Sequence, residues 1–157
     1  MTAPTQLERR LVCPGPDATT ALGRALAGAA RAGDVICLWG DLGAGKTHLA
    51  KAIGAGLGVT DTITSPSFIL MAEYTGRLPV FHIDLYRLAD ASDALGGGLI
   101  DDRQAAGLTL VEWPDRLGPA LPAHRLDVRI DGSGDEPRSI TLMAVDPDLR
   151  RYLDAVP

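Results

Sequence analysis

The sequence is poor in lysine, and its positive charge is spread thinly. Only Lys46 and Lys51 are lysines, and the other 13 basic residues are arginines that form nothing longer than pairs such as Arg9-Arg10. The formal net charge is −5 at pH 7. Because nonspecific binding to nucleic acid needs clustered cationic side chains, we expect no binding to DNA, and contact with RNA only through a partner.

Cysteines, aromatic residues and long apolar runs are also scarce. The only cysteines, Cys13 and Cys37, lack the spacing of a metal site, so we expect free thiols in the core. Aromatic residues make up 4% of a chain that is 46% hydrophobic, which predicts an aliphatic core. No signal-peptide pattern and no apolar run of about 18 residues occurs. We therefore expect a cytoplasmic protein without a membrane segment.

What the sequence does contain is one glycine-rich motif. Residues 40–47 read GDLGAGKT and fit G-x-x-x-x-G-K-[ST], the phosphate-binding P-loop. The apolar run at residues 35–39 predicts a buried strand before the motif, and residues 47–57 predict a helix after it. Glycines allow successive backbone N–H groups to face one concavity, and the helix N-terminus favours an anion there.

The motif assigns a nucleotide and its metal to particular residues. Lys46 can reach the β- and γ-phosphates of ATP or ADP, and the Thr47 hydroxyl can bind Mg²⁺. The residues that we predict to bind the nucleotide are Gly43, Ala44, Gly45, Lys46, Thr47 and His48.

Two carboxylates follow apolar segments elsewhere in the chain. Glu112 ends the run at residues 108–111, where a P-loop protein needs an acidic group for Mg²⁺, although a strand-end surface glutamate would have the same pattern. Asp84 could coordinate Mg²⁺ or orient an attacking water, or it could cap a turn or pair with Arg87. The predicted catalytic residues are therefore Lys46, Asp84 and Glu112, and the predicted metal ligands are Thr47 and Glu112.

Strand alternation places His82 on the same side as Asp84. A histidine in such a position is more often a hydrogen-bonded structural residue than a catalytic base.

The order of apolar segments predicts one α/β domain. Its core would span about residues 7–145, followed by a short C-terminal tail. We expect a central, mostly parallel sheet flanked by helices, with antiparallel hairpins at residues 68–83 and 125–145. Residues 35–39 and 108–111 should be neighbouring strands, or at most one strand apart. A helix should follow Pro14-Gly15-Pro16, with Asp17 as its N-cap.

Three further positions allow more than one interpretation. Ser65 and Ser67, on either side of Pro66, could sense a γ-phosphate as a switch loop does, or could belong to an ordinary turn. Trp113 could be a core residue or an anchor at an interface.

Four stretches together resemble one family. GDLGAGKT at residues 40–47, TSPSF at 64–68, HIDLYR at 82–87 and VEWP at 111–114 are similar to motifs of the TsaE (YjeE) family, in the same order. The resemblance covers roughly residues 7–145. His48 departs from the family pattern because a second threonine commonly follows the P-loop threonine, and Ser67 replaces a common threonine but keeps the hydroxyl.

The resemblance implies a role in tRNA modification. It implies a P-loop ATPase with Mg²⁺ held at Thr47 and Glu112, acting with the transferase TsaD and its paralogue TsaB. That complex forms N6-threonylcarbamoyladenosine at position 37 of tRNAs that read codons beginning with A. The alternatives are a small-molecule kinase, which usually has an arginine-bearing lid over the phosphates, and a nucleotide-dependent binding module without hydrolysis. A GTPase is disfavoured because the sequence has no Asn-Lys-x-Asp stretch.

Overall fold

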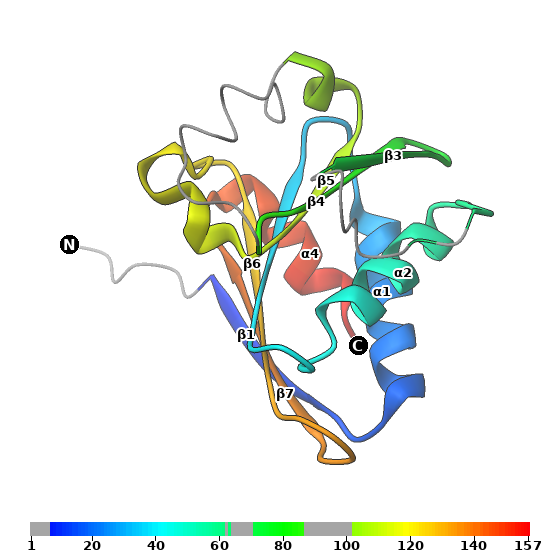
Figure 1. Cartoon of the computed structure of the whole chain (residues 1–157), viewed down its shortest axis with the longest axis vertical. Helices are drawn as coiled ribbons and strands as arrows, with labels where there is room; N and C mark the ends of the chain where they lie inside the picture. Colours follow the sequence, from blue (N-terminus) through cyan, green and yellow to red (C-terminus); the bar gives the residue numbers. More distant parts are fainter. Residues whose placement is uncertain (1–6, 62, 64–70, 87–101) are drawn as a thin grey trace.

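The computed structural model describes residues 7–61, 63, 71–86 and 102–157 of the chain, and Figure 1 shows their arrangement. The strands are β1 (Glu8–Cys13), β2 (Val35–Trp39), β3 (Met71–Thr75), β4 (Pro79–Asp84), β5 (Leu108–Glu112), β6 (Leu126–Asp131) and β7 (Arg138–Ala144). The helices are α1 (Pro16–Ala29), α2 (Lys46–Gly56) and α4 (Arg150–Ala155), with the short 3-10 segments η1 (Asp102–Ala106), η2 (Pro114–Ala120) and η3 (Pro147–Leu149).

Seven strands form one mixed sheet in the order β1-β7-β6-β2-β5-β4-β3. The four inner strands β6, β2, β5 and β4 run parallel to one another. Antiparallel pairing adds β3 at one edge, and β7 with β1 at the other. The mostly parallel core is therefore confirmed, and so are both hairpins, although residues 68–70 of the first lie outside the described residues. Residues 35–39 and 108–111 are directly neighbouring strands, β2 and β5.

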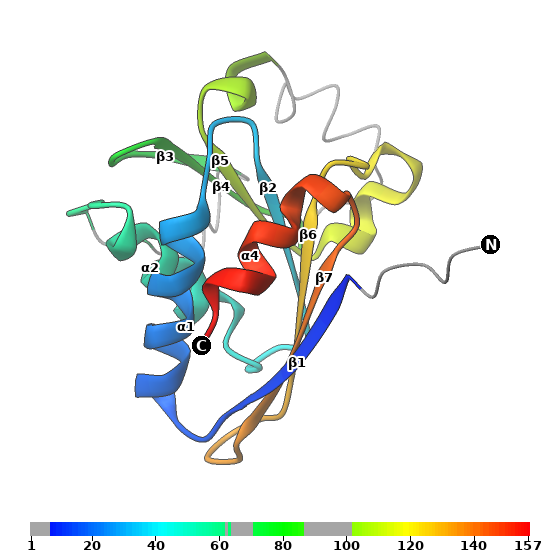
Figure 2. The same ribbon diagram turned by 180° about the vertical axis from the view of Figure 1, so that it is seen from behind.

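The central strand β2 divides the core into two apolar layers. Ile36 and Leu38 belong to the larger cluster, while Cys37 between them belongs to a smaller one, because side chains alternate along a strand. Each of α1, α2 and α4 contributes buried apolar residues to the larger cluster, and Figure 2 shows α1 and α4 side by side. Leu117 of η2 packs into the smaller cluster, so within the described residues that face is covered by a 3-10 segment.

The start of α1 and its contact with α2 each depend on a glycine. The N-cap of α1 is Gly15, so the prediction of Asp17 as N-cap is wrong. Pro16 takes the first helical position, where its missing N–H costs nothing, and this moves Asp17 into the first turn. Gly23 lets α1 and α2 approach closely, because a Cβ there would lie 2.4 Å from the Cβ of Ala52.

Both cysteines are free and buried, as the sequence predicts. Among the described residues, no helix combines the length and the apolar character needed to cross a bilayer.

Candidate nucleotide-binding site

The glycine-rich motif forms the turn between the C-terminal end of β2 and the N-terminus of α2. Gly45 is the N-cap of α2 and has φ 110°, a left-handed conformation that favours glycine. Gly40 passes close to β6, since a Cβ there would lie 2.7 Å from the carbonyl oxygen of Ile130. The turn therefore has the strand-to-helix context that a P-loop requires, and α2 directs its first N–H groups into it.

Lys46 is held inside this turn and is 5% exposed. Its ammonium group donates hydrogen bonds to the carbonyl oxygens of Gly40 and Asp41, the second at 3.0 Å. Burial lowers the pKa of Lys46, and nearby carboxylates, Glu112 first among them, oppose that lowering. The predicted contact with β- and γ-phosphates stays a prediction, and the cation needed for it lies in the loop.

Thr47 and Glu112 meet where α2 begins and β5 ends. The Thr47 hydroxyl lies 3.1 Å and 3.2 Å from the two carboxylate oxygens of Glu112. Glu112 is 3% exposed, so the alternative of a strand-end surface glutamate is wrong. These oxygens come from segments 65 residues apart in the sequence, and pairing of β2 with β5 brings them together.

His82 lies beneath this pair on the neighbouring strand β4. Its Nε2 donates a hydrogen bond of 2.6 Å to Oε2 of Glu112, and its side chain is fully buried. The other ring nitrogen, Nδ1, is buried without a hydrogen-bond partner among the described residues. His82 thus orients Glu112, in agreement with the prediction of a hydrogen-bonded histidine.

Asp84 lies next to Glu112 in the parallel register of β4 and β5. Its Oδ1 accepts a hydrogen bond of 3.0 Å from the backbone N–H of Tyr86, which is the turn-capping role considered above. The sheet therefore brings both predicted carboxylates to the same edge as the P-loop. Their assignment to catalysis stays a prediction. Arg87, the alternative partner of Asp84, lies outside the described residues, as do Ser65 and Ser67 of the proposed switch loop.

Trp113 covers the lysine from the end of β5. The Lys46 ammonium lies 4.1 Å from the centre of a Trp113 ring. The ring of Tyr86, which follows the end of β4, has its centre 5.0 Å from that of a Trp113 ring. Trp113 has φ 59°, an unfavourable conformation for a bulky residue, and among the described residues it is the only non-glycine residue with positive φ. This conformation brings the indole over Lys46, where it stabilises the cation. Trp113 is therefore part of the site.

Arg138, at the start of β7, was not predicted from the sequence. Its Nε donates to the carbonyl oxygen of Ala44 at 2.8 Å, and its Nη2 lies 3.4 Å from that of Gly43. Nη2 also donates to the carbonyl oxygen of Gly134 at 3.0 Å, within the turn between β6 and β7. The arginine thus ties the P-loop to this hairpin. A single arginine after a turn carries no sequence signal for such a contact.

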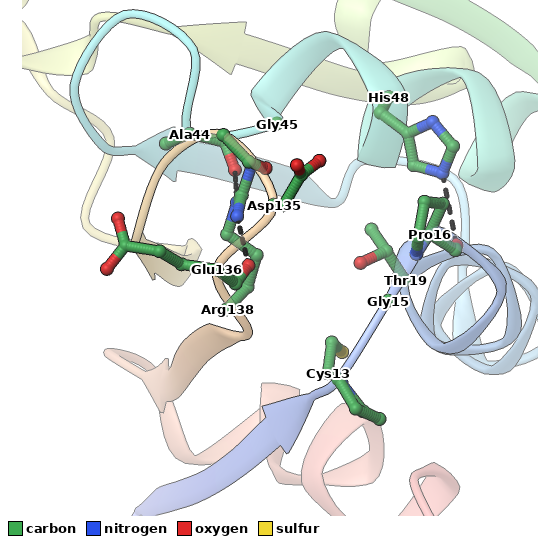
Figure 3. A pocket seen from close by; sticks show the side chains of 12 residues that line it. Cys13, Gly15, Pro16, Thr19, Ala44, Gly45, His48, Asp135, Glu136 and Arg138 are labelled. Atoms are coloured by element: carbon green, nitrogen blue, oxygen red, sulfur yellow. Dashed lines mark hydrogen bonds between the residues drawn. The ribbon is translucent and has the colours of Figure 1, made fainter.

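A pocket of about 310 Å³ opens beside the loop, and Figure 3 shows its lining. It lies between the start of α1, the start of α2 and the β6–β7 hairpin. His48 faces α1 across one side, with Nε2 placed 3.2 Å from the Thr20 hydroxyl and 3.3 Å from the carbonyl oxygen of Pro16. The lining residues are Cys13, Pro14, Gly15, Pro16, Thr19, Ala44, Gly45, His48, Gly134, Asp135, Glu136 and Arg138.

Comparison with known proteins gives consistent results. Residues 13–140 match the family described as "Threonylcarbamoyl adenosine biosynthesis protein TsaE". The chain is 43% identical over 141 residues to the tRNA threonylcarbamoyladenosine biosynthesis protein TsaE of Bacillus subtilis, covering 89% of this chain and 87% of that protein. It is 38% identical over 128 residues to the protein of the same name from Streptomyces coelicolor, covering 77% and 86% respectively.

A solved structure is also similar over nearly its full length. The crystal structure of Bacillus subtilis YdiB matches with a TM-score of 0.73 and 34% identity, covering 99% of this chain and 97% of that one. The family match spans most of the sheet, from the end of β1 into β7, and includes the P-loop, Asp84 and Glu112. The chain belongs to the TsaE family of tRNA threonylcarbamoyladenosine biosynthesis proteins.

Proposed function

We propose that this chain is an ATPase that binds ATP with Mg²⁺ and supports the TsaB–TsaD transferase complex. The reaction supported is formation of N6-threonylcarbamoyladenosine at position 37 of tRNAs that read codons beginning with A. The observation that carries the ATPase assignment is the meeting of Thr47 and Glu112 at the mouth of the glycine-rich loop. Family membership supports the pathway, and the resemblance described above supplies the partners.

The donor set fits Mg²⁺. Ligands at right angles in an octahedral Mg²⁺ site lie about 3 Å apart, since each bond is about 2.1 Å long, and the Thr47 and Glu112 oxygens are 3.1 Å apart. Among the described residues, no group of three or more Asp, Glu, His and Cys side chains could form a protein-only metal site. Mg²⁺ in nucleotide sites usually takes one or two protein ligands, with phosphate and water supplying the others. When bound there, the ion would neutralise charge that develops on the phosphates.

The chain's own residues would then act in three ways. The loop N–H groups and Lys46 would hold the phosphates, and Lys46 would exchange its bonds to Gly40 and Asp41 for phosphate oxygens. Asp84, beside Glu112, would orient the attacking water. The pocket between His48 and Arg138 would hold the base and ribose, because it opens directly from the loop residues Ala44 and Gly45.

Nucleotide-dependent docking would couple hydrolysis to the partner complex. Asp84 and Tyr86 lie at the end of β4, and Tyr86 contacts Trp113, which in turn covers Lys46. A phosphate that draws Lys46 away from Trp113 would therefore change the surroundings of Tyr86. Because the chain carries a net charge of −5, we propose that it meets tRNA only through the complex.

Titration calorimetry and a phosphate-release assay with ATP, with and without Mg²⁺, test the ATPase assignment. We expect binding in both conditions and phosphate release only with Mg²⁺. Binding without phosphate release, both alone and with TsaB–TsaD present, would favour a non-hydrolysing module. Transfer of the phosphate to an added small molecule would favour a kinase.

Co-elution with the TsaB–TsaD pair in ATP, in ADP and without nucleotide tests the partner assignment. We expect the amount that co-elutes to differ between these states, and the isolated chain to bind tRNA weakly in a salt-sensitive way. Identical co-elution in all three states, or tight salt-resistant binding of tRNA by the chain alone, would contradict docking controlled by the nucleotide.

A further inference from the structure

A second hollow lies away from the P-loop, where α1 ends beside α4, the two helices seen together in Figure 2. It has a volume of about 710 Å³ and is lined by four of the chain's 13 arginines. Asp154 is the one acidic residue among the described residues that line it. Arg24 belongs to α1, Arg31 follows that helix, Arg77 lies between β3 and β4, and Arg151 belongs to α4. This concentration of positive charge contrasts with a net charge of −5 for the whole chain.

Two of these arginines are fixed by the protein. Nη2 of Arg77 donates to the carbonyl oxygens of Ala27 at 2.9 Å and Ala30 at 3.3 Å, at the C-terminal end of α1. Nε of Arg151 donates to the carbonyl oxygen of Ala29 at 3.0 Å, and its Nη2 pairs with the buried Asp34. These bonds satisfy carbonyl groups that a helix end leaves unpaired. They also hold both guanidinium groups at the hollow without needing a ligand to order them.

The other two arginines of the hollow, Arg24 and Arg31, do not cap a helix. Arg24 and Arg31 are exposed, and the side chain of neither makes a hydrogen bond or an ion pair within the described parts of the chain. Nε and Nη1 of Arg77 are likewise without a hydrogen bond to the residues that the structure describes. The floor between the arginines is formed by small residues of α1 such as Ala25 and Gly28, so a ligand can reach the helix surface.

We propose that this hollow is a binding site for the phosphate groups of a polyanion. The arginines approach from three different segments, and a tetrahedral phosphate presents oxygens in several directions, whereas a carboxylate presents two in one plane. Among the residues that the structure describes, no aromatic side chain lines the hollow on which a base could stack. The site therefore binds phosphate and reads no base, and the phosphate comes from a free oligophosphate or from an RNA backbone.

Titration calorimetry with inorganic triphosphate tests the site in the Lys46→Ala variant, which weakens competing binding at the P-loop. We expect Arg24→Glu and Arg31→Glu, each made in that background, to weaken binding at least tenfold. The matched control is Arg10→Glu, an exposed arginine of β1 that is paired with Glu8, and it should change binding less than twofold. No binding by the Lys46→Ala protein, or equal loss in all three variants, would overturn the site.

Competition with tRNA identifies the source of the phosphate, and two further measurements test whether the site is selective for phosphate and separate from the P-loop. If tRNA displaces the triphosphate, the site binds an RNA backbone, and if it does not, the site binds a free oligophosphate. A poly-glutamate peptide that binds more tightly than triphosphate would contradict the phosphate assignment. In a chain with intact Lys46, Arg24→Glu and Arg31→Glu should leave ATP hydrolysis without partners unchanged. A matching loss of that hydrolysis would mean that the hollow and the P-loop are not separate sites.

Discussion

Two carboxylates are buried among the residues that the structure describes, and their surroundings contrast. Asp34 is 2% exposed and Glu112 is 3% exposed. Asp34 accepts hydrogen bonds from the Arg151 guanidinium, from the Tyr152 hydroxyl at 2.5 Å and from the backbone N–H of Arg31 at 2.9 Å. Glu112 accepts hydrogen bonds from Thr47 and His82.

The donors around the two carboxylates show that Asp34 is a structural carboxylate and that Glu112 is available for a cation. A charged partner and two further donors satisfy Asp34, which joins the chain before β2 to α4. Glu112 is bonded by a hydroxyl that can itself bind a metal and by one imidazole nitrogen, and among the described residues no arginine or lysine forms an ion pair with it, so its charge is open to an ion. Burial alone therefore does not identify a functional carboxylate, and the type of donor around it does.

The largest effect on ATP hydrolysis should come from removing Lys46, whose ammonium group lies near Glu112. Lys46→Ala should reduce ATP hydrolysis about a thousandfold, because it removes a donor to the phosphates in a site shielded from water. Steady-state phosphate release measures this loss. The control is Lys51→Ala, since Lys51 is the only other lysine and is exposed on α2. Hydrolysis that survives Lys46→Ala would exclude the P-loop as the site.

Removing the structural carboxylate should affect folding and not chemistry. Asp34→Ala leaves the Arg151 guanidinium and the Tyr152 hydroxyl without their acceptor, and it should lower the free energy of unfolding by about 3 kcal/mol. Urea denaturation measures the change, and ATP binding at a temperature where the variant is folded should be unaltered. A selective loss of ATP binding would remove the distinction between the two carboxylates.

Glu112→Gln should show the opposite pattern. The amide keeps the shape and an oxygen for Thr47 but loses the charge that attracts Mg²⁺, so we expect turnover to fall about 10- to 100-fold. The loss of stability should be smaller than that of Asp34→Ala, because His82 keeps a neutral acceptor. Parallel measurements of hydrolysis and urea denaturation compare the two variants. A variant that simply unfolds would mean that Glu112 has a structural role only.

The smallest expected effect is on the pH dependence of stability, through His124, which contacts both Asp146 and Asp34. His124 Nδ1 lies 3.0 Å from Asp146, and its Nε2 lies 3.4 Å from Asp34. The hydrogen bond to Asp146, and then that to Asp34, raises the pKa of His124 above 6.5 although partial burial opposes this. The stability that it contributes is full below the unfolded-state pKa and is lost as pH rises through the folded-state pKa.

The wild-type chain should therefore lose slightly more stability between pH 6 and pH 8 than a His124→Gln variant does. Thermal unfolding at both pH values measures the difference. Equal pH dependence of the two proteins would show that His124 does not take up a proton on folding.

Sequence reasoning found the parts of the site that have local signals. The motif at residues 40–47 and the carboxylate after residues 108–111 both follow apolar runs, and parallel pairing brings such strand ends to one edge. Arg138 could not be found in this way, because its contact with Ala44 depends on β6 pairing with β2 and on β7 pairing with β6. The position of Trp113 over Lys46 depends on a left-handed backbone that its residue type disfavours. The arginine hollow likewise requires three segments that only the folded chain brings together.

The Arg138 contact has a consequence for the thermodynamics of nucleotide binding. Arg138 and Lys46 hold carbonyl groups on both sides of the loop, at Ala44 and at Gly40 and Asp41. The backbone entropy of the loop is therefore already lost when the chain folds, and little remains to be lost when ATP binds. An Arg138→Ala chain would defer that ordering to the binding step, which should make the binding entropy less favourable even where the contacts with ATP are the same.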